Sequence, residues 1–105
     1  MKILQLGNCY LSEPFREMGH EVKWASVHPG ADVVLEPFLV EATSVLAALP
    51  SGWSPDLIVL GDESMFPKLL GLEALSIPLV WYAIDSHIHH TWHRPYAAVW
   101  DFIFV

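Results

Sequence analysis

The sequence predicts an α/β protein: a Rossmann-like, doubly wound, mostly parallel sheet of about five strands in a three-layer arrangement. Two almost wholly apolar runs, residues 56–61 and 79–84, each lie between turn residues and are separated by a leucine-rich stretch. Runs that are apolar on both faces and alternate with helices are typical of parallel strands buried between helices. With 105 residues, the chain is expected to form one domain.

The start of the chain predicts two strands with a short helix between them. Residues 2–6 form an apolar run that closes at a glycine, as expected for a first buried strand. Ser12 is a suitable N-cap for a helix of about two turns, and Gly19 is suited to the left-handed position at its end. Residues 21–26 alternate in polarity and predict the second strand.

The middle of the chain predicts further alternation of strand and helix. Residues 31–37 indicate a brief extended segment, and the apolar spacing over 38–49 predicts a one-sided helix. The two apolar runs, 56–61 and 79–84, predict the next strands, with one loose helix at 67–75 between them.

Residues 101–105 repeat the strand pattern, and the sequence stops inside that apolar run. Because exposed apolar strand ends invite aggregation, we expect that Val105 is a truncation point of a longer chain. The apolar share of 53% is also high for a domain of this size. Some apolar surface is therefore expected to meet a partner, and it would also allow a homodimer.

The charge of the chain excludes two classes of partner. Twelve acidic residues against five basic ones give a net charge of -7, and the basic residues are scattered. Such a surface repels phosphate backbones and anionic lipids, so we expect neither nucleic acid nor membrane binding. No apolar run approaches the roughly 18 residues of a membrane span, and no secretory signal is recognisable. A cytoplasmic protein is expected, with the single Cys9 as a reduced, small apolar filler.

Polar side chains follow the predicted strands at the points where they end. Asn8 follows the first strand, Asp62 and Glu63 follow the run at 56–61, and Asp85 and His87 follow the run at 79–84. Because ligands of open α/β sheets bind outside the carboxyl ends of the strands, we expect these residues near a cleft. Adjacent side chains diverge, so one of the two carboxylates at 62 and 63 would face it. The sequence has no GxGxxG, no P-loop and no GxSxG motif.

Residues 85–94, DSHIHHTWHR, hold four of the six histidines. If the segment is helical, His89 and His93 share one face at i, i+4 and can present two imidazoles to zinc; an extended start would instead align Asp85 with His87. Three interpretations stay open. They are metal binding, acid/base or hydroxyl-binding chemistry at a cleft, and simple packing of Trp92 and His93 over the sheet.

Three segments carry a family resemblance: REMGHEVKW, PDLIVLGDES, and IPLVWYAIDSHIHHTWHRPYAAVWDFIFV. Together they resemble the amino-terminal half of bacterial group 1 glycosyltransferases of the GT-B fold, near the spore-maturation-protein-like branch. The resemblance covers essentially the whole chain. It implies that the chain is the acceptor-side domain of a hexosyl-transferase type enzyme, inactive without a carboxyl-terminal donor-binding domain. The implied substrates are a nucleotide-sugar donor for the full-length enzyme and a small-molecule or glycan acceptor, with no cofactor bound by this domain.

The resemblance also implies roles for the polar residues at the strand ends. Asp85 and His87 would be catalytic, in contact with the acceptor or the transferring sugar. The implied or candidate substrate-binding residues are Asn8, Asp62, Glu63, His89, Trp92 and His93. One departure is the first loop, GNCYLSEP, which is not glycine-rich as in many members of the family.

Two other functions are consistent with the same residues. The first is a metal-binding module or metal-dependent hydrolase that uses Asp85, His87, His89 and His93. The second is a flavodoxin-like or receiver-like interaction domain. Gly7 and Asn8 count against a receiver domain, because they stand where it would need an acidic pair.

Overall fold

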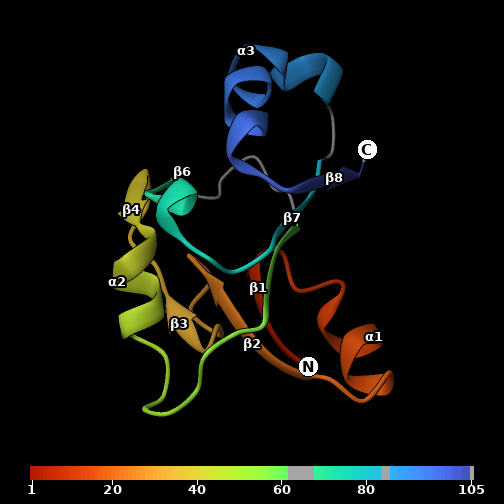
Figure 1. Cartoon of the computed structure of the whole chain (residues 1–105), viewed down its shortest axis with the longest axis vertical. Helices are drawn as coiled ribbons and strands as arrows, with labels where there is room; N and C mark the ends of the chain where they lie inside the picture. The colour runs from red at the N-terminus through yellow and green to blue at the C-terminus, as the bar shows by residue number, and fades with distance from the viewer. Residues whose placement is uncertain (62–67, 84–85, 105) are drawn as a thin grey trace.

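The computed structural model describes residues 1–61, 68–83 and 86–104, and the side chains of residues 86–88 and 90 lie outside that description. The described elements follow in chain order (Figure 1): β1 (Lys2–Gly7), α1 (Ser12–Glu17), β2 (Glu21–Ser26), β3 (Val33–Val34), β4 (Leu39–Glu41), α2 (Ala42–Ala47), β5 (Leu57–Gly61), β6 (Lys68–Leu70), the 3₁₀ turn η1 (Leu72–Ala74), β7 (Leu79–Tyr82), α3 (Ser86–Tyr96), the 3₁₀ turn η2 (Ala97–Val99) and β8 (Phe102–Phe104).

The main sheet has six strands in the order β3-β2-β1-β5-β7-β8, and each neighbouring pair is parallel. The predicted parallel α/β fold is therefore confirmed, with six strands instead of five. The order reverses direction between β1 and β5, as in the doubly wound Rossmann arrangement and unlike the flavodoxin-like order. A second, two-stranded parallel sheet pairs β4 with β6.

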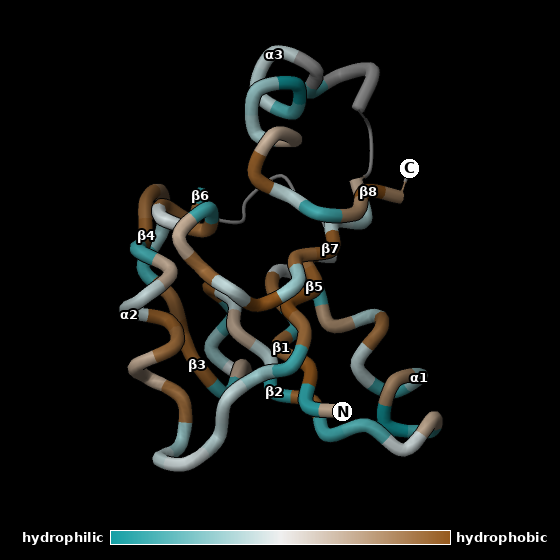
Figure 2. The backbone as a smooth tube through the Cα atoms, in the orientation of Figure 1, coloured by the Kyte–Doolittle hydropathy of each residue, from teal (hydrophilic) through white to brown (hydrophobic). Residues whose placement is uncertain are grey.

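Apolar side chains cover both faces of the sheet, because neighbouring residues of a strand point to opposite sides. Ile3 of β1 packs in a small cluster with Val22 and Val59, against Phe15 of α1. Leu4 and its neighbours on the other face belong to the larger core, which includes residues of α2, η1 and the segment from α3 to η2. Figure 1 shows α1 and α2 on opposite sides of the strands, and Figure 2 shows hydrophobic residues along β1 and β5 between them.

Helix α1 ends as predicted but does not begin as predicted. Gly19 has a φ of 93°, its N–H donates to Arg16, and the next N–H, of His20, donates to Phe15. These two bonds form the Schellman motif that glycine allows at this position. Ser12, however, is not the N-cap. It is the first helical residue, and its buried hydroxyl turns back to the sheet.

Two predicted helices are shorter than expected or absent. The helix predicted over 38–49 begins only at Ala42, because residues 39–41 pair with residues 68–70 as strands. The same pairing replaces part of the loose helix predicted at 67–75, where only a 3₁₀ turn follows the strand. The pairing begins where the N–H of Lys68 donates to the carbonyl oxygen of Phe38 at 2.7 Å, and Phe38 has a φ of 81°. Long-range backbone pairing here overrides the local helical pattern.

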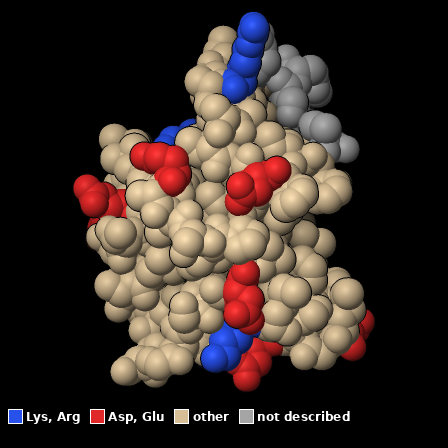
Figure 3. Space-filling model, viewed as in Figure 1, with Lys and Arg blue, Asp and Glu red and all other residues tan. Residues whose placement is uncertain are grey.

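The charged side chains are distributed over the surface as the sequence predicts. Charged side chains on the face in Figure 3 are scattered, and most of that face is uncharged. None of the described helices has both the length and the apolar character needed to cross a bilayer. The expectation that Cys9 fills the core is wrong, because this residue is exposed in the loop after β1.

Candidate functional site

The point where the strand order reverses lies between the carboxyl ends of β1 and β5. Gly7 ends β1 beside Gly61, which ends β5, and the N–H of Asn8 donates to the carbonyl oxygen of Gly61 at 3.2 Å. Gly7 has a φ of 83°, and a Cβ atom on it would lie 2.2 Å from that oxygen. The two strand ends therefore meet in direct backbone contact, and only glycine fits at position 7.

A buried amide lies beneath this junction. Gln5 of β1 is completely buried, and its Oε1 accepts a hydrogen bond from the Ser12 hydroxyl at 3.4 Å. Its Nε2 has no hydrogen-bond partner in the described part of the chain. That nitrogen would lie 3.0 Å from a Cβ atom on Gly61, so it sits directly under the end of β5. An unsatisfied buried donor costs about 1–3 kcal/mol, which makes this position a candidate for ligand or water binding.

Among the predicted site residues that follow strands, Asn8 is the only one whose side chain the structure describes. It is half-buried, and its Oδ1 accepts the N–H of Tyr10 at 3.3 Å, which shapes the loop after β1. That oxygen would lie 2.7 Å from a Cβ atom on Gly61. Asn8 and Gln5 therefore bring two carboxamide groups to the junction of β1 and β5.

Aromatic and imidazole groups lie beside the junction at the end of β2. The Trp24 indole N–H donates to the carbonyl oxygen of Gly7 at 2.7 Å. The exposed His28 ring lies 5.4 Å from the Trp24 ring, and its Nδ1 accepts the N–H of Gly30 at 3.0 Å. With Nδ1 occupied as an acceptor, the neutral ring carries its proton on Nε2, away from that turn. Trp24 and His28 were not among the predicted site residues, although Trp24 lies in the second predicted strand and His28 lies in the turn that follows it.

The histidine-rich segment is helical, which is the condition under which His89 and His93 share one face. In α3, His89 and His93 lie on one face with their ring centroids 5.4 Å apart. His87 lies in the first turn of α3, and its side chain is outside the described residues, as is the whole of Asp85. Asp62 and Glu63 also lie outside the described residues. The placement of Asp85 and His87 near the junction of β1 and β5 therefore remains a prediction.

The described part of α3 belongs to an aromatic cluster around Trp81 of β7. Trp81 is 1% exposed and its ring stacks on Trp92 at 6.0 Å, while His93 meets it edge-on at 4.7 Å. Tyr96 and Trp100 complete the cluster. Ring contacts from Trp92, His93 and Tyr96 thereby hold the later part of α3 against β7.

This packing sets the accessibility of the predicted binding residues on α3. His93 is 5% exposed, and Trp92 is half-buried with the Lys68 ammonium 3.5 Å from its ring centroid. His89 is half-buried at the edge of the cluster, with its ring 5.8 Å from Trp92. Of these three side chains, His93 has the least access to a ligand in solution. Among the described residues, no three side chains of His, Cys, Asp or Glu converge as a metal site would require.

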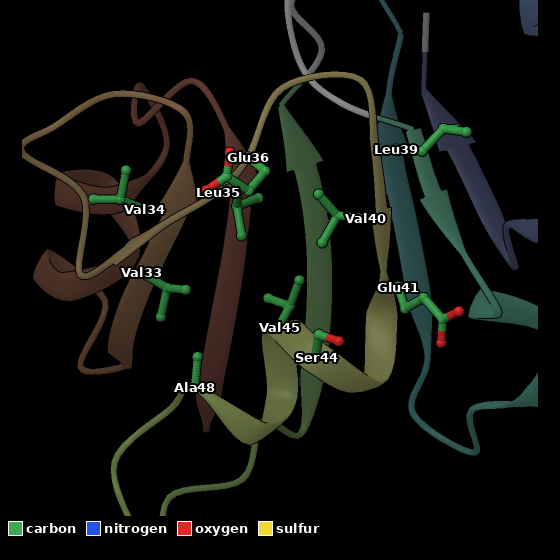
Figure 4. A pocket seen from close by; sticks show the side chains of 10 residues that line it. All are labelled: Val33, Val34, Leu35, Glu36, Leu39, Val40, Glu41, Ser44, Val45 and Ala48. Atoms are coloured by element: carbon green, nitrogen blue, oxygen red, sulfur yellow. The ribbon is translucent and has the colours of Figure 1, made fainter.

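A pocket of about 340 Å³ lies elsewhere, between β3 and α2. In Figure 4, Val33 and Leu35 face Val40 and Val45 across it, and the side chain of Glu41 points away. Its lining is mostly apolar and contains none of the predicted site residues. It therefore has no part in the chemistry considered above.

Comparison of the chain with protein-family models, with curated proteins and with solved structures finds no match. The resemblance to glycosyltransferases therefore rests on the sequence segments alone, and the fold on the strand order described above.

Proposed function

We propose that this chain is the amino-terminal, acceptor-side domain of a GT-B glycosyltransferase, and that it binds a sugar hydroxyl at the junction of β1 and β5. The observation that carries the proposal is the reversal of strand order at that junction. In open α/β sheets, ligands bind in the crevice outside the carboxyl ends of the strands at this point. The half-buried carboxamide of Asn8 lies there and is suited to hydroxyl recognition, and the buried carboxamide of Gln5 lies directly beneath it.

The chemistry of sugar transfer assigns the rest of the proposed site. The acceptor hydroxyl oxygen attacks the anomeric carbon of the donor, the bond to the nucleoside diphosphate breaks, and the hydroxyl proton passes to a base. Asp85 and His87 are the proposed residues for that work, because in the sequence they follow β7, whose carboxyl end lies at the same edge of the sheet. A carboxylate or a neutral imidazole can accept the proton near neutral pH.

Donor contacts are assigned to the carboxyl-terminal domain that the resemblance implies, so this chain is expected to bind acceptor without turnover. We would test it by titrating the ¹⁵N-labelled chain with glucose, maltose and UDP-glucose in turn. Binding should shift the amide signals of Asn8, Gly61 and the first turn of α3. Amides at the amino ends of the strands, such as Leu57, should stay unchanged.

A matched pair of variants sharpens the test. Asn8→Ala should reduce the sugar-induced shifts at least about tenfold, since it removes one of the two side-chain carboxamides near the junction. Ser51→Ala, in the exposed turn at the opposite edge, should leave them unchanged. Absence of shifts with all three compounds at millimolar concentration, or shifts confined to the amino edge, would rule out the proposal.

The second candidate is a metal-binding module, and the spacing of His89 and His93 favours it. Two imidazoles bound to one tetrahedral zinc ion have ring centres about 5 Å apart, close to the 5.4 Å observed. Asp85 and His87 would supply the other ligands. Calorimetric titration with Zn²⁺ should then give one site that His89→Ala abolishes and His28→Ala retains. Equal affinity of both variants, or no heat at all, would exclude it.

A further inference from the structure

Strand β8 leaves an open apolar edge on the main sheet. It is the last strand in the order, and no described strand lies beyond it. Phe102 and Phe104 are 59% and 58% exposed, and Ile103 is 40% exposed. Figure 2 shows this strand as hydrophobic although it lies at the periphery of the molecule. Apolar strands at the edge of a parallel sheet are normally covered by another element, and no described element covers β8.

The backbone of β8 has one residue that faces outward. The N–H of Ala83 donates to the carbonyl oxygen of Phe104 at 2.8 Å, so the backbone groups of Phe104 face β7. Neighbouring residues in a strand turn their N–H and C=O groups to opposite edges. Ile103 therefore turns its N–H and C=O away from β7, toward the open edge.

The opposite side of the sheet is protected against the same kind of pairing. On β2, the carboxylate of Asp32 accepts the N–H of Trp24 at 2.8 Å, and the Arg16 guanidinium donates to the carbonyl oxygen of Val22 at 3.3 Å. Strand β3, beyond them, has only two residues and is followed closely by Pro37. Charged side chains, short strands and proline are the usual means of blocking edge pairing. Strand β8 is also short, with three residues, but it contains no charged side chain and no proline.

The sequence of β8 is its own reverse, Phe-Ile-Phe. Antiparallel pairing of two copies about an axis at Ile103 would place Phe102 opposite Phe104 of the other copy, twice. The two outward Ile103 residues would exchange both N–H···O bonds, as a hydrogen-bonded antiparallel pair does. Cross-strand aromatic pairs add to the stability of such a ladder.

Charge does not oppose this contact, although the chain carries a net charge of -7. Asp101 precedes β8 in the sequence, and its carboxylate accepts the N–H of Leu79 at 2.8 Å, so it is turned toward β7. Tyr82, which is 46% exposed, pairs in register with Phe104 and extends the apolar surface on the same face. The patch is thus self-complementary and uncharged, which suits a second copy of the chain.

We infer that two copies of this chain dimerise by antiparallel pairing of β8, which joins their sheets into one. The exposed parts of Phe102, Ile103, Phe104 and Tyr82 amount to about 400 Å² per copy, taking 150–250 Å² for a large side chain. A standard interface buries about 800 Å² per partner, so the dimer should be weak and concentration-dependent. This inference is independent of the proposed function.

Sedimentation velocity of the chain from about 1 µM to about 1 mM tests the inference. Ile103→Lys should raise the dimer dissociation constant at least about tenfold, because two ammonium groups would meet at the axis. Val34→Lys is the matched control, since Val34 is 57% exposed on the strand at the opposite edge. It should leave dimerisation unchanged. A chain that stays monomeric throughout, or equal weakening by both variants, would overturn the inference.

Cross-linking tests the register without relying on a disruptive variant. In a Cys9→Ser background, Ile103→Cys places two thiols across the axis, and the roughly 5.5 Å between Cα atoms of such a pair suits a disulfide. Mild oxidation should then give a covalent dimer. Val34→Cys in the same background should stay monomeric. Failure of Ile103→Cys to cross-link, or equal cross-linking at both positions, would contradict the proposed pairing.

Discussion

A methyl group on Gly7 would lie 2.2 Å from the carbonyl oxygen of Gly61. Gly7 and Gly61 end β1 and β5 in register, so their backbones meet at the point where the strand order reverses. The half-buried carboxamide of Asn8 lies at this junction, and the fully buried carboxamide of Gln5 lies beneath it.

Gly7→Ala should lower the free energy of unfolding by at least about 3 kcal/mol, because strain at positive φ adds to a clash with backbone. Gly19→Ala is the control. Gly19 has a φ of 93°, but a Cβ atom on it would have no neighbouring atom within 4 Å, so its cost should be about 1 kcal/mol. Urea denaturation measures both. Equal losses of unfolding free energy in the two variants would mean that the close approach to Gly61 adds nothing to the cost of Gly7→Ala.

Trp81→Ala should cost about 3–5 kcal/mol, because Trp81 is 1% exposed and contacts four other rings. Loss of near-ultraviolet circular dichroism should accompany it. Trp53→Ala, at a half-buried position, should cost about 1–2 kcal/mol. If both variants are equally stable, the aromatic cluster is not what holds α3 to the sheet.

Adding Gln5→Met to Ser12→Ala should raise the free energy of unfolding by about 1 kcal/mol relative to Ser12→Ala alone, because it removes a buried amide that then has no described partner on its nitrogen or its oxygen. The same variant should weaken the sugar-induced amide shifts, which is the usual conflict between stability and function. Ser12→Ala should instead lower stability by about 1 kcal/mol by leaving the Gln5 oxygen without its donor. A loss of stability when Gln5→Met is added to Ser12→Ala would indicate that the Gln5 nitrogen has a hydrogen-bond partner within the protein.

Cys9 should react with Ellman's reagent in the folded protein, with one thiol per chain, because its side chain is exposed. Adding urea to unfolding concentration should raise the rate by less than about tenfold. Cys9→Ser should change stability by less than about 0.5 kcal/mol, as surface substitutions do. A thiol that reacts only after unfolding would contradict the exposed position.

The parts of the fold that could be predicted are those with a strong local cause. Residues 56–61 and 79–84 carry apolar runs between turn residues, and they became β5 and β7 with small changes at their ends. Gly19 ended α1 because few other residues adopt its backbone conformation. The interpretation failed at 39–41 and 68–70, where helices were predicted from apolar spacing and from leucine content, and pairing between these distant segments formed strands.

The candidate site was predicted only in outline. The position of polar residues after apolar runs indicated Asn8, because such residues mark the edge of a sheet. The same criterion missed Gln5, whose one indication is a single amide inside the apolar run KILQL. It also could not show that His93 is buried, because the helical spacing in α3 is the same whether the ring meets solvent or Trp81.

Local sequence patterns account for the alternation of strand and helix, the parallel sheet and the edge at which polar residues gather. Each of these follows from the succession of apolar residues and turn formers along the chain. The strand order, the contact of Gly7 with Gly61, the burial of Gln5 and the open edge at Ile103 arise only in the folded chain. They depend on which distant segments pair and pack, and local spacing carries no information about that choice.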